Sequence, residues 1–212
     1  MTDKSPCINN RASTACASGH RKGNWNMRVI AGTARSLPLK APKGMDTRPT
    51  TDRIKETLFN ILQPYLLDSV FVDLFAGSGA IGIEALSRGA KKCYFVEQER
   101  EASECILDNL KFTHFTDQAV LFKQDVFSAL YQIFEKEADL IFLDPPYGKE
   151  YEKKVLDALK DVKYVTDNTI IIVEANLSTD FSYTEEMGFE IFKQKKYKTN
   201  QHVFLRKSRE RL

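Results

Sequence analysis

Apolar residues recur along the chain with two spacings, one typical of strands and the other typical of helices. Short apolar runs predict strands at 70–74, 92–96, 119–123, 140–143 and 169–173. Amphipathic stretches predict helices near 80–87, 100–112, 126–134 and 152–159. Because parallel strands need crossover connections, this alternation predicts a parallel sheet with helices on both faces. Ligands bind such sheets at the carboxyl ends of the strands.

The segment before this alternation has a different pattern. Two short alternating stretches, 27–31 and 37–41, predict a small β-hairpin. Apolar residues at helical spacing over 54–62 predict an amphipathic helix, with Thr50 or Thr51 as its N-cap.

The two ends of the chain complete the predicted organisation. Strand-like runs at 189–194 and 202–205, with a short turn region between them, predict a terminal antiparallel hairpin. Residues 1–26 show no periodicity and are expected to be a disordered leader. We therefore expect one domain over 27–212, in which 27–47 forms the hairpin extension.

Composition is that of an ordinary globular protein, with 42% hydrophobic and 28% charged residues among 212. Apolar runs fall short of the roughly 18 to 20 residues that cross a bilayer, so we expect a cytoplasmic protein without a membrane segment. Cys7, Cys16, Cys93 and Cys105 lack metal-ligand spacing, which predicts free thiols and no metal site. We also expect a monomer.

Charge is distributed unevenly although the net charge is only +2. Residues 1–27 carry +3, 28–56 carry +4, 57–192 carry −12 and 193–212 carry +7. Two basic ends around an acidic middle could hold a phosphate backbone, or they could be ordinary solvated surfaces.

The strongest local motif is the glycine-rich turn that follows the first strand of the alternation. Gly77, Gly79 and Gly82 let the backbone approach a ligand and leave helix N–H groups facing it. The same glycines, with Glu97 after the next strand, also fit a dinucleotide-binding fingerprint. A nicotinamide or flavin oxidoreductase is therefore an alternative from this motif alone.

Three acidic residues end the first three strands of the alternation. Asp73, just before the glycine turn, could receive the cationic amino end of S-adenosylmethionine but would repel a pyrophosphate. Glu97 could accept both hydroxyls of a ribose, or belong to a solvated charge run. Asp125 could accept from an adenine amino group, cap the following helix, or do both.

The deciding motif is Asp144-Pro145-Pro146-Tyr147 at the end of the fourth strand. Two prolines fix the backbone and remove its donors, which leaves the Asp144 carboxylate and the Pro145 carbonyl as rigid acceptors. An aromatic amino group is a poor nucleophile, and acceptance of its hydrogens would favour a pyramidal nitrogen aimed at a methyl group. Tyr147 could stack on the base.

Several motifs together carry a family resemblance that covers about residues 27–207. The chain resembles the bacterial methyltransferases that modify N2 of a guanine in 16S ribosomal RNA. Ser36 stands where such proteins commonly have glycine, and residues 1–26 have no counterpart. The matching segments are 48–53, 56–62, 73–82, 84–90 and 144–147.

The resemblance implies a Rossmann-like class I methyltransferase fold in the α/β class, with a seven-stranded, mostly parallel sheet ending in an antiparallel hairpin. It also implies S-adenosylmethionine as cofactor and small-subunit ribosomal RNA or the assembled 30S subunit as partner. The positions expected to bind the cofactor are Asp73, Phe75, Gly77, Gly79, Glu97, Asp125 and Val126. Those expected to bind RNA are Arg48, Arg53, Lys195, Lys196 and Lys198. Adenine-N6 methylation of DNA or RNA and a non-catalytic ribosome-binding role remain alternatives.

Overall fold

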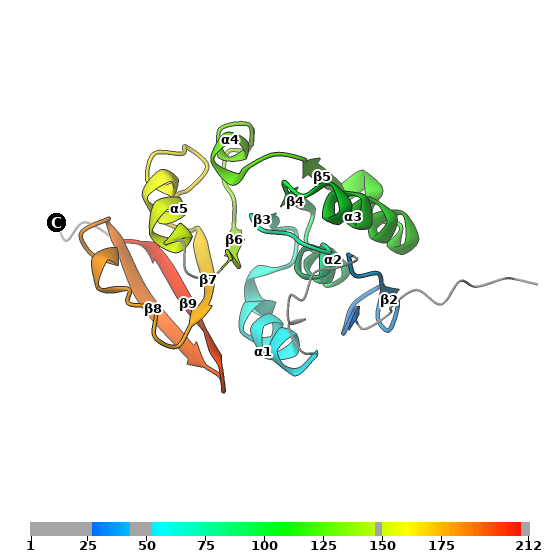
Figure 1. Ribbon diagram of the computed structural model, residues 1–212, viewed down its shortest axis with the longest axis horizontal. Helices are drawn as coiled ribbons and strands as arrows, with labels where there is room; N and C mark the ends of the chain where they lie inside the picture. Colours follow the sequence, from blue (N-terminus) through cyan, green and yellow to red (C-terminus); the bar gives the residue numbers. More distant parts are fainter. Residues whose placement is uncertain (1–26, 43–51, 147–149, 209–212) are drawn as a thin grey trace, which may run out of the picture.

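The computed structural model describes residues 27–42, 52–146 and 150–208. Within them, a seven-stranded sheet has the order β5-β4-β3-β6-β7-β9-β8 (Figure 1). The first five strands in this order are parallel, and β9 pairs antiparallel with both β7 and β8. The predicted fold class is therefore confirmed. The strands are β3 (Val70–Asp73), β4 (Lys92–Val96), β5 (Ala119–Phe122), β6 (Leu140–Leu143), β7 (Ile170–Asn176), β8 (Phe189–Lys196) and β9 (Asn200–Lys207).

Helices cover both faces of the sheet and create two separate apolar layers. Helices α1 (Asp52–Leu62), α2 (Ala80–Ser87) and α3 (Arg100–Thr113) pack on one face. Helices α4 (Val126–Leu130) and α5 (Tyr151–Leu159) pack on the other. Single-turn 3-10 helices lie at Gln63–Tyr65, Thr116–Gln118 and Ser182–Thr184.

Neighbouring residues of the central strands point into opposite layers. On β7, Ile172 joins the layer under α1 to α3, whereas Ile171 joins the layer under α4 and α5. Phe142 and Phe204 belong to the first layer and are almost completely buried. Burial of each such side chain contributes about 1.5–3 kcal/mol.

Several elements differ in length from the sequence expectation, helix α4 and strand β7 among them. Helix α4 ends at Leu130, short of the expected end at residue 134, and the Leu130 carbonyl accepts a hydrogen bond from the Tyr164 hydroxyl at 3.1 Å. Strand β7 continues to Asn176, because β9 pairs with it as far as Asn200. That extension carries Glu174 into the sheet.

The N-terminal hairpin is smaller than its sequence pattern suggests. It consists of β1 (Met27–Arg28) and β2 (Pro38–Leu39), paired antiparallel. Between them Ser36 has φ +69°, a left-handed conformation that favours glycine. A glycine would adopt this backbone conformation without strain, whereas Ser36 carries a Cβ. The predicted N-cap residues Thr50 and Thr51 lie outside the described residues.

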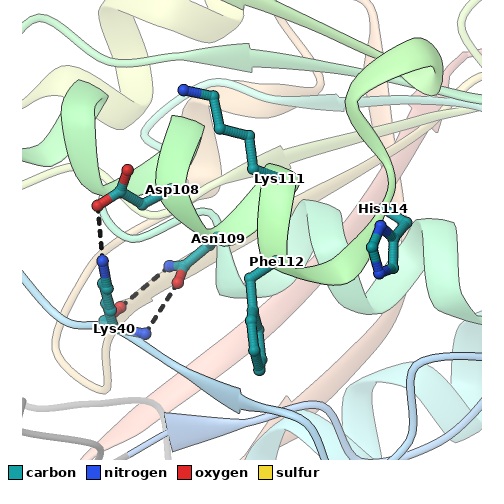
Figure 2. A pocket seen from close by; sticks show the side chains of 6 residues that line it. All are labelled: Lys40, Asp108, Asn109, Lys111, Phe112 and His114. Atoms are coloured by element: carbon teal, nitrogen blue, oxygen red, sulfur yellow. Dashed lines mark hydrogen bonds and ion pairs between the residues drawn. The ribbon is translucent and has the colours of Figure 1, made fainter. Parts of the chain in front are cut away.

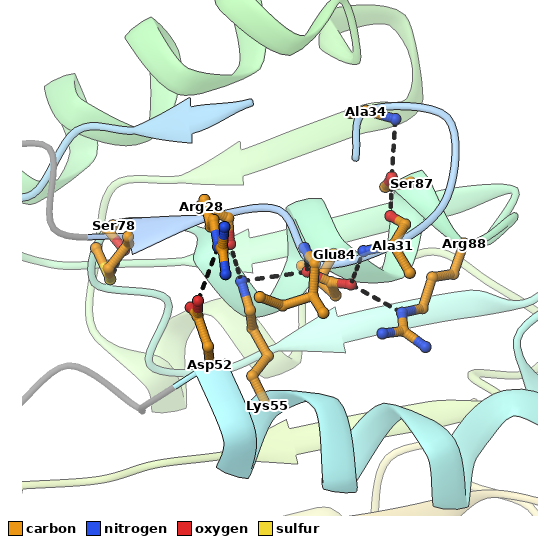
Figure 3. Close-up of polar contacts among 12 residues, drawn as sticks. Arg28, Ala31, Ala34, Asp52, Lys55, Ser78, Glu84, Ser87 and Arg88 are labelled. Carbon is orange, nitrogen blue, oxygen red and sulfur yellow. Dashed lines mark hydrogen bonds and ion pairs between the residues drawn. The ribbon is translucent and has the colours of Figure 1, made fainter. Parts of the chain in front are cut away.

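A buried ionic cluster ties the hairpin and α1 to α2 (Figure 3). The Glu84 carboxylate accepts the backbone N–H groups of Ile30 at 2.8 Å and Ala31 at 3.0 Å. Lys55 lies 3.2 Å and Arg88 2.8 Å from the same carboxylate. Since Glu84 is fully buried, these partners compensate the cost of burying its charge.

The segment after β2 is anchored near the glycine turn. Asn109 on α3 accepts from the backbone N–H of Lys40 at 2.8 Å and donates to the Lys40 carbonyl at 3.0 Å (Figure 2). It also donates to the Ser78 carbonyl at 2.9 Å. The N-terminal extension is thus connected to the loop after β3. Among the helices of the described residues, none has the length and apolar character needed to span a membrane.

Candidate functional site

The strand order reverses between β3 and β6, and the candidate site lies at their carboxyl ends. Chain connections lead from β3 to β4 on one side and from β6 to β7 on the other. The two strand ends are joined by a hydrogen bond from the Leu74 N–H to the Phe142 carbonyl at 3.0 Å. A crevice for a ligand forms at such a reversal, because successive connections leave in opposite directions.

The glycine turn after β3 has the backbone geometry expected of a close-approach loop. Gly79 has φ +78° and stands at the N-cap of α2. A Cβ at Gly82 would lie 2.3 Å from a ring carbon of Phe95 and 2.6 Å from the Cys93 sulfur. Gly82 thus permits α2 to pack tightly against β4, a role separate from ligand contact.

Asp73 ends β3 and is almost completely buried beneath the turn. Its Oδ2 accepts the Gly82 N–H at 3.2 Å, whereas its Oδ1 is buried without a hydrogen-bond partner. Burial, together with the nearby charge of Glu97, raises the pKa of Asp73 to about 7. A buried acceptor without a donor suits the cationic ammonium group of a methionine-type ligand.

Glu97 follows β4 and is bound to the backbone by both carboxylate oxygens. Oε2 accepts the Gly77 N–H at 2.8 Å, and Oε1 accepts the Glu99 N–H at 2.8 Å. Burial raises the pKa of Glu97 from its ordinary value, although these two hydrogen bonds oppose the shift. Glu97 is thus held rigidly against the glycine turn, and its contact with a ribose stays a prediction.

Asp125 caps α4. Its Oδ1 accepts the Ser128 N–H at 3.0 Å and its Oδ2 accepts the Ser128 hydroxyl at 2.6 Å, which lowers the pKa of Asp125. Val126, the next residue, is buried in the layer under α4 and α5. A contact of either residue with the cofactor stays a prediction.

Three aromatic rings from distant segments meet beside the turn, and sequence reasoning identified only one of them. Tyr151 on α5 lies edge-on to Phe75 with ring centroids 6.0 Å apart and stacks on Phe127 at 6.3 Å. Only Phe75 belongs to a recognisable motif. Each ring is half-buried, so the group offers an apolar surface for a flat ring.

Asp144 follows β6 at the other side of the reversal. Burial and the charges of Glu174, Asp73 and Glu152 raise the pKa of Asp144 well above its ordinary value. Pro145 is buried and Pro146 exposed, while Tyr147 lies outside the described residues.

Carboxylates therefore gather at one edge of the sheet from β3, β6, β7 and α5. Their mutual repulsion is relieved by a cation or by donors, which fits an ammonium or sulfonium group and an amine. Within 27–42, 52–146 and 150–208, no three acidic, histidine or cysteine residues are arranged to hold a metal ion.

Sequence reasoning gave no role to a second polar group at this edge. Glu174 on β7 lies 3.0 Å from the Nε2 atom of His202 on β9, and the Nδ1 atom of His202 lies 3.1 Å from the Tyr197 hydroxyl. The signal in the sequence was weak, because the two halves are 28 residues apart. Only the antiparallel pairing of β7 and β9 brings them together.

The predicted RNA-binding residues are not gathered in one place. Arg48 lies outside the described residues, and Arg53 is exposed on α1. Lys195 and Lys196 are exposed on the edge strand β8, and Lys198 is exposed in the following turn. Their contact with RNA stays a prediction.

A surface cavity of about 470 Å³ lies elsewhere, over the carboxyl half of α3 (Figure 2). Lys40, Asn109, Phe112 and His114 are among the residues that line it. Since the predicted catalytic and cofactor residues are absent from its lining, we assign it no part in the site.

Comparison with known proteins identifies the family of the chain. The family model described as Conserved hypothetical protein 95 matches residues 27–206. A relative from Bacillus subtilis named "Putative rRNA methyltransferase YlbH" is 38% identical over 160 residues, which are 74% of this chain and 87% of that protein.

A second relative, from Escherichia coli K12, is named "Ribosomal RNA small subunit methyltransferase D". It is 35% identical over 158 residues, covering 74% of this chain and 79% of that protein. The solved structure "Putative methyltransferase yhhF from Escherichia coli" has a TM-score of 0.72 and 30% identity, covering 86% of this chain and 98% of that one. The chain therefore belongs to the Conserved hypothetical protein 95 family, the family of ribosomal RNA small subunit methyltransferase D.

Proposed function

We propose that the protein transfers a methyl group from S-adenosylmethionine to the exocyclic N2 amino group of a guanine in small-subunit ribosomal RNA, in the cytoplasm. The observation that carries this proposal is the position of Asp73 and Asp144 at the carboxyl ends of the paired strands β3 and β6. One end offers an unpaired acceptor for a cation, and the other offers an acceptor for an amine. The names of the relatives support ribosomal RNA as substrate.

The cofactor is expected on the β3 and β4 side of the site. Asp73 would accept its ammonium group, Gly77 and Gly79 would border it, and Glu97 would accept its ribose hydroxyls. When bound, S-adenosylmethionine supplies an electrophilic methyl group. Phe75 would pack against its flat ring.

The target amine is expected on the β6 side. Asp144 and the Pro145 carbonyl would accept its two hydrogens, which directs the nitrogen lone pair away from the ring plane. Rate enhancement then comes mainly from holding the reactants in line. After transfer the nitrogen is cationic and acidic, and the raised pKa of Asp144 suits this carboxylate to take the released proton.

The direct test is methylation of 30S subunits that have never been modified. Subunits and free 16S RNA are each incubated with methyl-labelled S-adenosylmethionine, and the labelled nucleoside is identified after digestion. We expect N2-methylguanosine at one position. Labelled N6-methyladenosine would instead establish the alternative reaction, and absence of label from both substrates would contradict the enzymatic function.

The oxidoreductase alternative is tested by calorimetry with S-adenosylhomocysteine and with NAD. We expect binding of the first and none of the second. Binding of NAD alone would overturn the cofactor assignment.

A further inference from the structure

A buried polar cluster lies beside the proposed amine site. We call the four residues Glu174, Tyr197, Asn200 and His202 the Glu174 cluster. One Glu174 oxygen accepts from the Asn200 amide and the other contacts His202, which in turn contacts the Tyr197 hydroxyl. Glu174, Asn200 and His202 are each more than nine-tenths buried.

The cluster is adjacent to Asp144 in the sheet. Leu143 on β6 pairs with Val173 on β7, so that Asp144 and Glu174 are the next residues on neighbouring strands. Glu174 in turn pairs directly with His202 on β9. The register therefore places the Glu174 cluster next to Asp144 in the sheet, on the side away from β3.

The hydrogen bonds of the cluster have a fixed direction. The Glu174 carboxylate can only accept, so the His202 Nε2 atom and the Asn200 Nδ2 atom both carry the shared hydrogens. With the shared hydrogen on Nε2, the His202 ring can accept at Nδ1 from the Tyr197 hydroxyl. These donors are directed into the cluster itself.

The cluster contains oxygen atoms that can still accept hydrogen bonds. The Asn200 Oδ1 atom is buried and has no hydrogen-bond partner, and the Glu174 oxygens retain further lone pairs. A buried acceptor without a hydrogen-bond partner is destabilising. The cluster also interrupts an apolar layer in which Phe142 and Phe204 surround His202, so an unsatisfied acceptor there indicates a missing donor.

Guanine supplies such a donor and adenine does not. Next to the 2-amino group of guanine is N1–H, a donor, whereas next to the 6-amino group of adenine is N1 without hydrogen, an acceptor. Resting on the methyltransferase function proposed above, we propose that the Glu174 cluster selects guanine by accepting its N1–H while Asp144 accepts from the amino group. Adenine would place its N1 lone pair against these acceptors.

The test uses 2-aminopurine, which keeps the 2-amino group but has no hydrogen on N1. Once the modified guanine is located, 16S RNA carrying guanine or 2-aminopurine at that position is reassembled into 30S particles. For the wild-type protein we expect kcat/KM to favour guanine by about 10- to 100-fold, the discrimination of one well-placed base contact.

Glu174→Gln should narrow this preference about tenfold, because the new amide can donate to N1 of 2-aminopurine. His202 can take its other tautomer and accept from the Gln side chain, so the fold has a way to accommodate the change. 2-Aminopurine also lacks the O6 atom of guanine. This difference affects the ratio of kcat/KM for guanine to kcat/KM for 2-aminopurine equally in wild type and variant, so it cancels when the two ratios are compared.

Glu152→Gln is the matched control. Glu152 is also buried and also raises the pKa of Asp144, but it lies on α5, outside the Glu174 cluster. We expect it to leave the guanine preference unchanged. A Glu152→Gln variant that narrows the preference as much as Glu174→Gln would attribute the effect to charge alone and overturn the proposal.

The melting temperature and S-adenosylhomocysteine binding show whether Glu174→Gln folds. If it does not fold, a second variant tests the same proposal. Asn200→Ala removes the unpaired acceptor and leaves the contact between Glu174 and His202; it should also narrow the preference. An unchanged preference in the folded variants overturns the base selection. Failure of the wild type to methylate guanine at all would instead refute the proposed function.

Discussion

Glu97 accepts the backbone N–H of Gly77 through Oε2 at 2.8 Å, which fixes the glycine turn after β3 to the end of β4. Its other oxygen accepts the Glu99 N–H at the same distance. The Glu97 carboxylate, which would accept the ribose hydroxyls of a cofactor, is therefore held in a fixed position relative to the glycine turn that would border the same cofactor.

Glu97→Gln is expected to weaken S-adenosylhomocysteine binding about tenfold or more, because an amide has one acceptor oxygen and hydrogen bonds to charged groups are worth about 1.5–3 kcal/mol. Calorimetry measures the change. Glu99→Gln, an exposed residue of the same charge run, is the control and should bind like the wild type. If Glu97→Gln binds S-adenosylhomocysteine with the affinity of the wild type, Glu97 does not contact the cofactor.

Asp73→Asn is expected to change the pH dependence of folding stability and, independently, to abolish S-adenosylhomocysteine binding. Asp73 has a raised pKa of about 7 in the fold, so folding favours its protonated form. The wild type therefore has its full stability below the ordinary pKa of 3.8 and loses part of it as pH rises toward 7. The Asn variant lacks this loss.

The melting temperature of Asp73→Asn relative to wild type should thus rise between about pH 4 and pH 7 and level off above. S-adenosylhomocysteine binding should be lost at every pH in that range, because the amide cannot compensate an ammonium charge. A melting difference independent of pH would show that Asp73 titrates normally.

Ser36→Gly is expected to stabilise the fold by about 1 kcal/mol, because Ser36 holds a left-handed backbone at φ +69° that costs a residue with a Cβ about that much. Urea denaturation measures the gain. Ser178→Gly, at an exposed residue without a positive φ, should be neutral or destabilising. Equal effects at both sites would contradict the strain at Ser36.

Replacing Lys195, Lys196 and Lys198 together by Ala should weaken binding to 16S RNA and reduce the salt dependence of the binding constant by up to about three phosphate contacts. The control replaces Lys91, Lys136 and Lys163 by Ala. These lysines are also exposed, but they precede β4, β6 and β7 and so lie at the amino ends of the parallel strands, away from the candidate site. Equal loss in both triple variants would indicate a nonspecific charge effect.

The parallel sheet and the residues at its strand ends could be predicted from sequence, because local signals define them. Asp73 and Asp144 each follow an apolar run directly, and the glycines between β3 and α2 form a recognisable turn. The terminal hairpin and the small N-terminal hairpin follow from the same pattern together with the family resemblance. The order of the strands in the sheet is known only from the structure.

The Glu174 cluster could not be predicted, since its members are brought together by pairing between strands. Glu174 lies just beyond the strand predicted at 169–173, and His202 begins the strand-like run at 202–205, so neither residue carries a local signal of its own. The group formed by Phe75, Phe127 and Tyr151 likewise depends on contacts between segments that are distant in the sequence. Such contacts produce no regular spacing of residues in the sequence from which they could be predicted.

The most direct test of the proposed reaction centre is the single-turnover rate of methyl transfer by Asp144→Ala, with Asp167→Ala as control. Asp167 is an exposed aspartate before β7, at the far edge of the sheet from the site. We predict that Asp144→Ala slows transfer by about 100-fold or more while S-adenosylhomocysteine still binds, and that Asp167→Ala transfers at the wild-type rate. A wild-type rate for Asp144→Ala would contradict the assignment of Asp144 to the reaction centre.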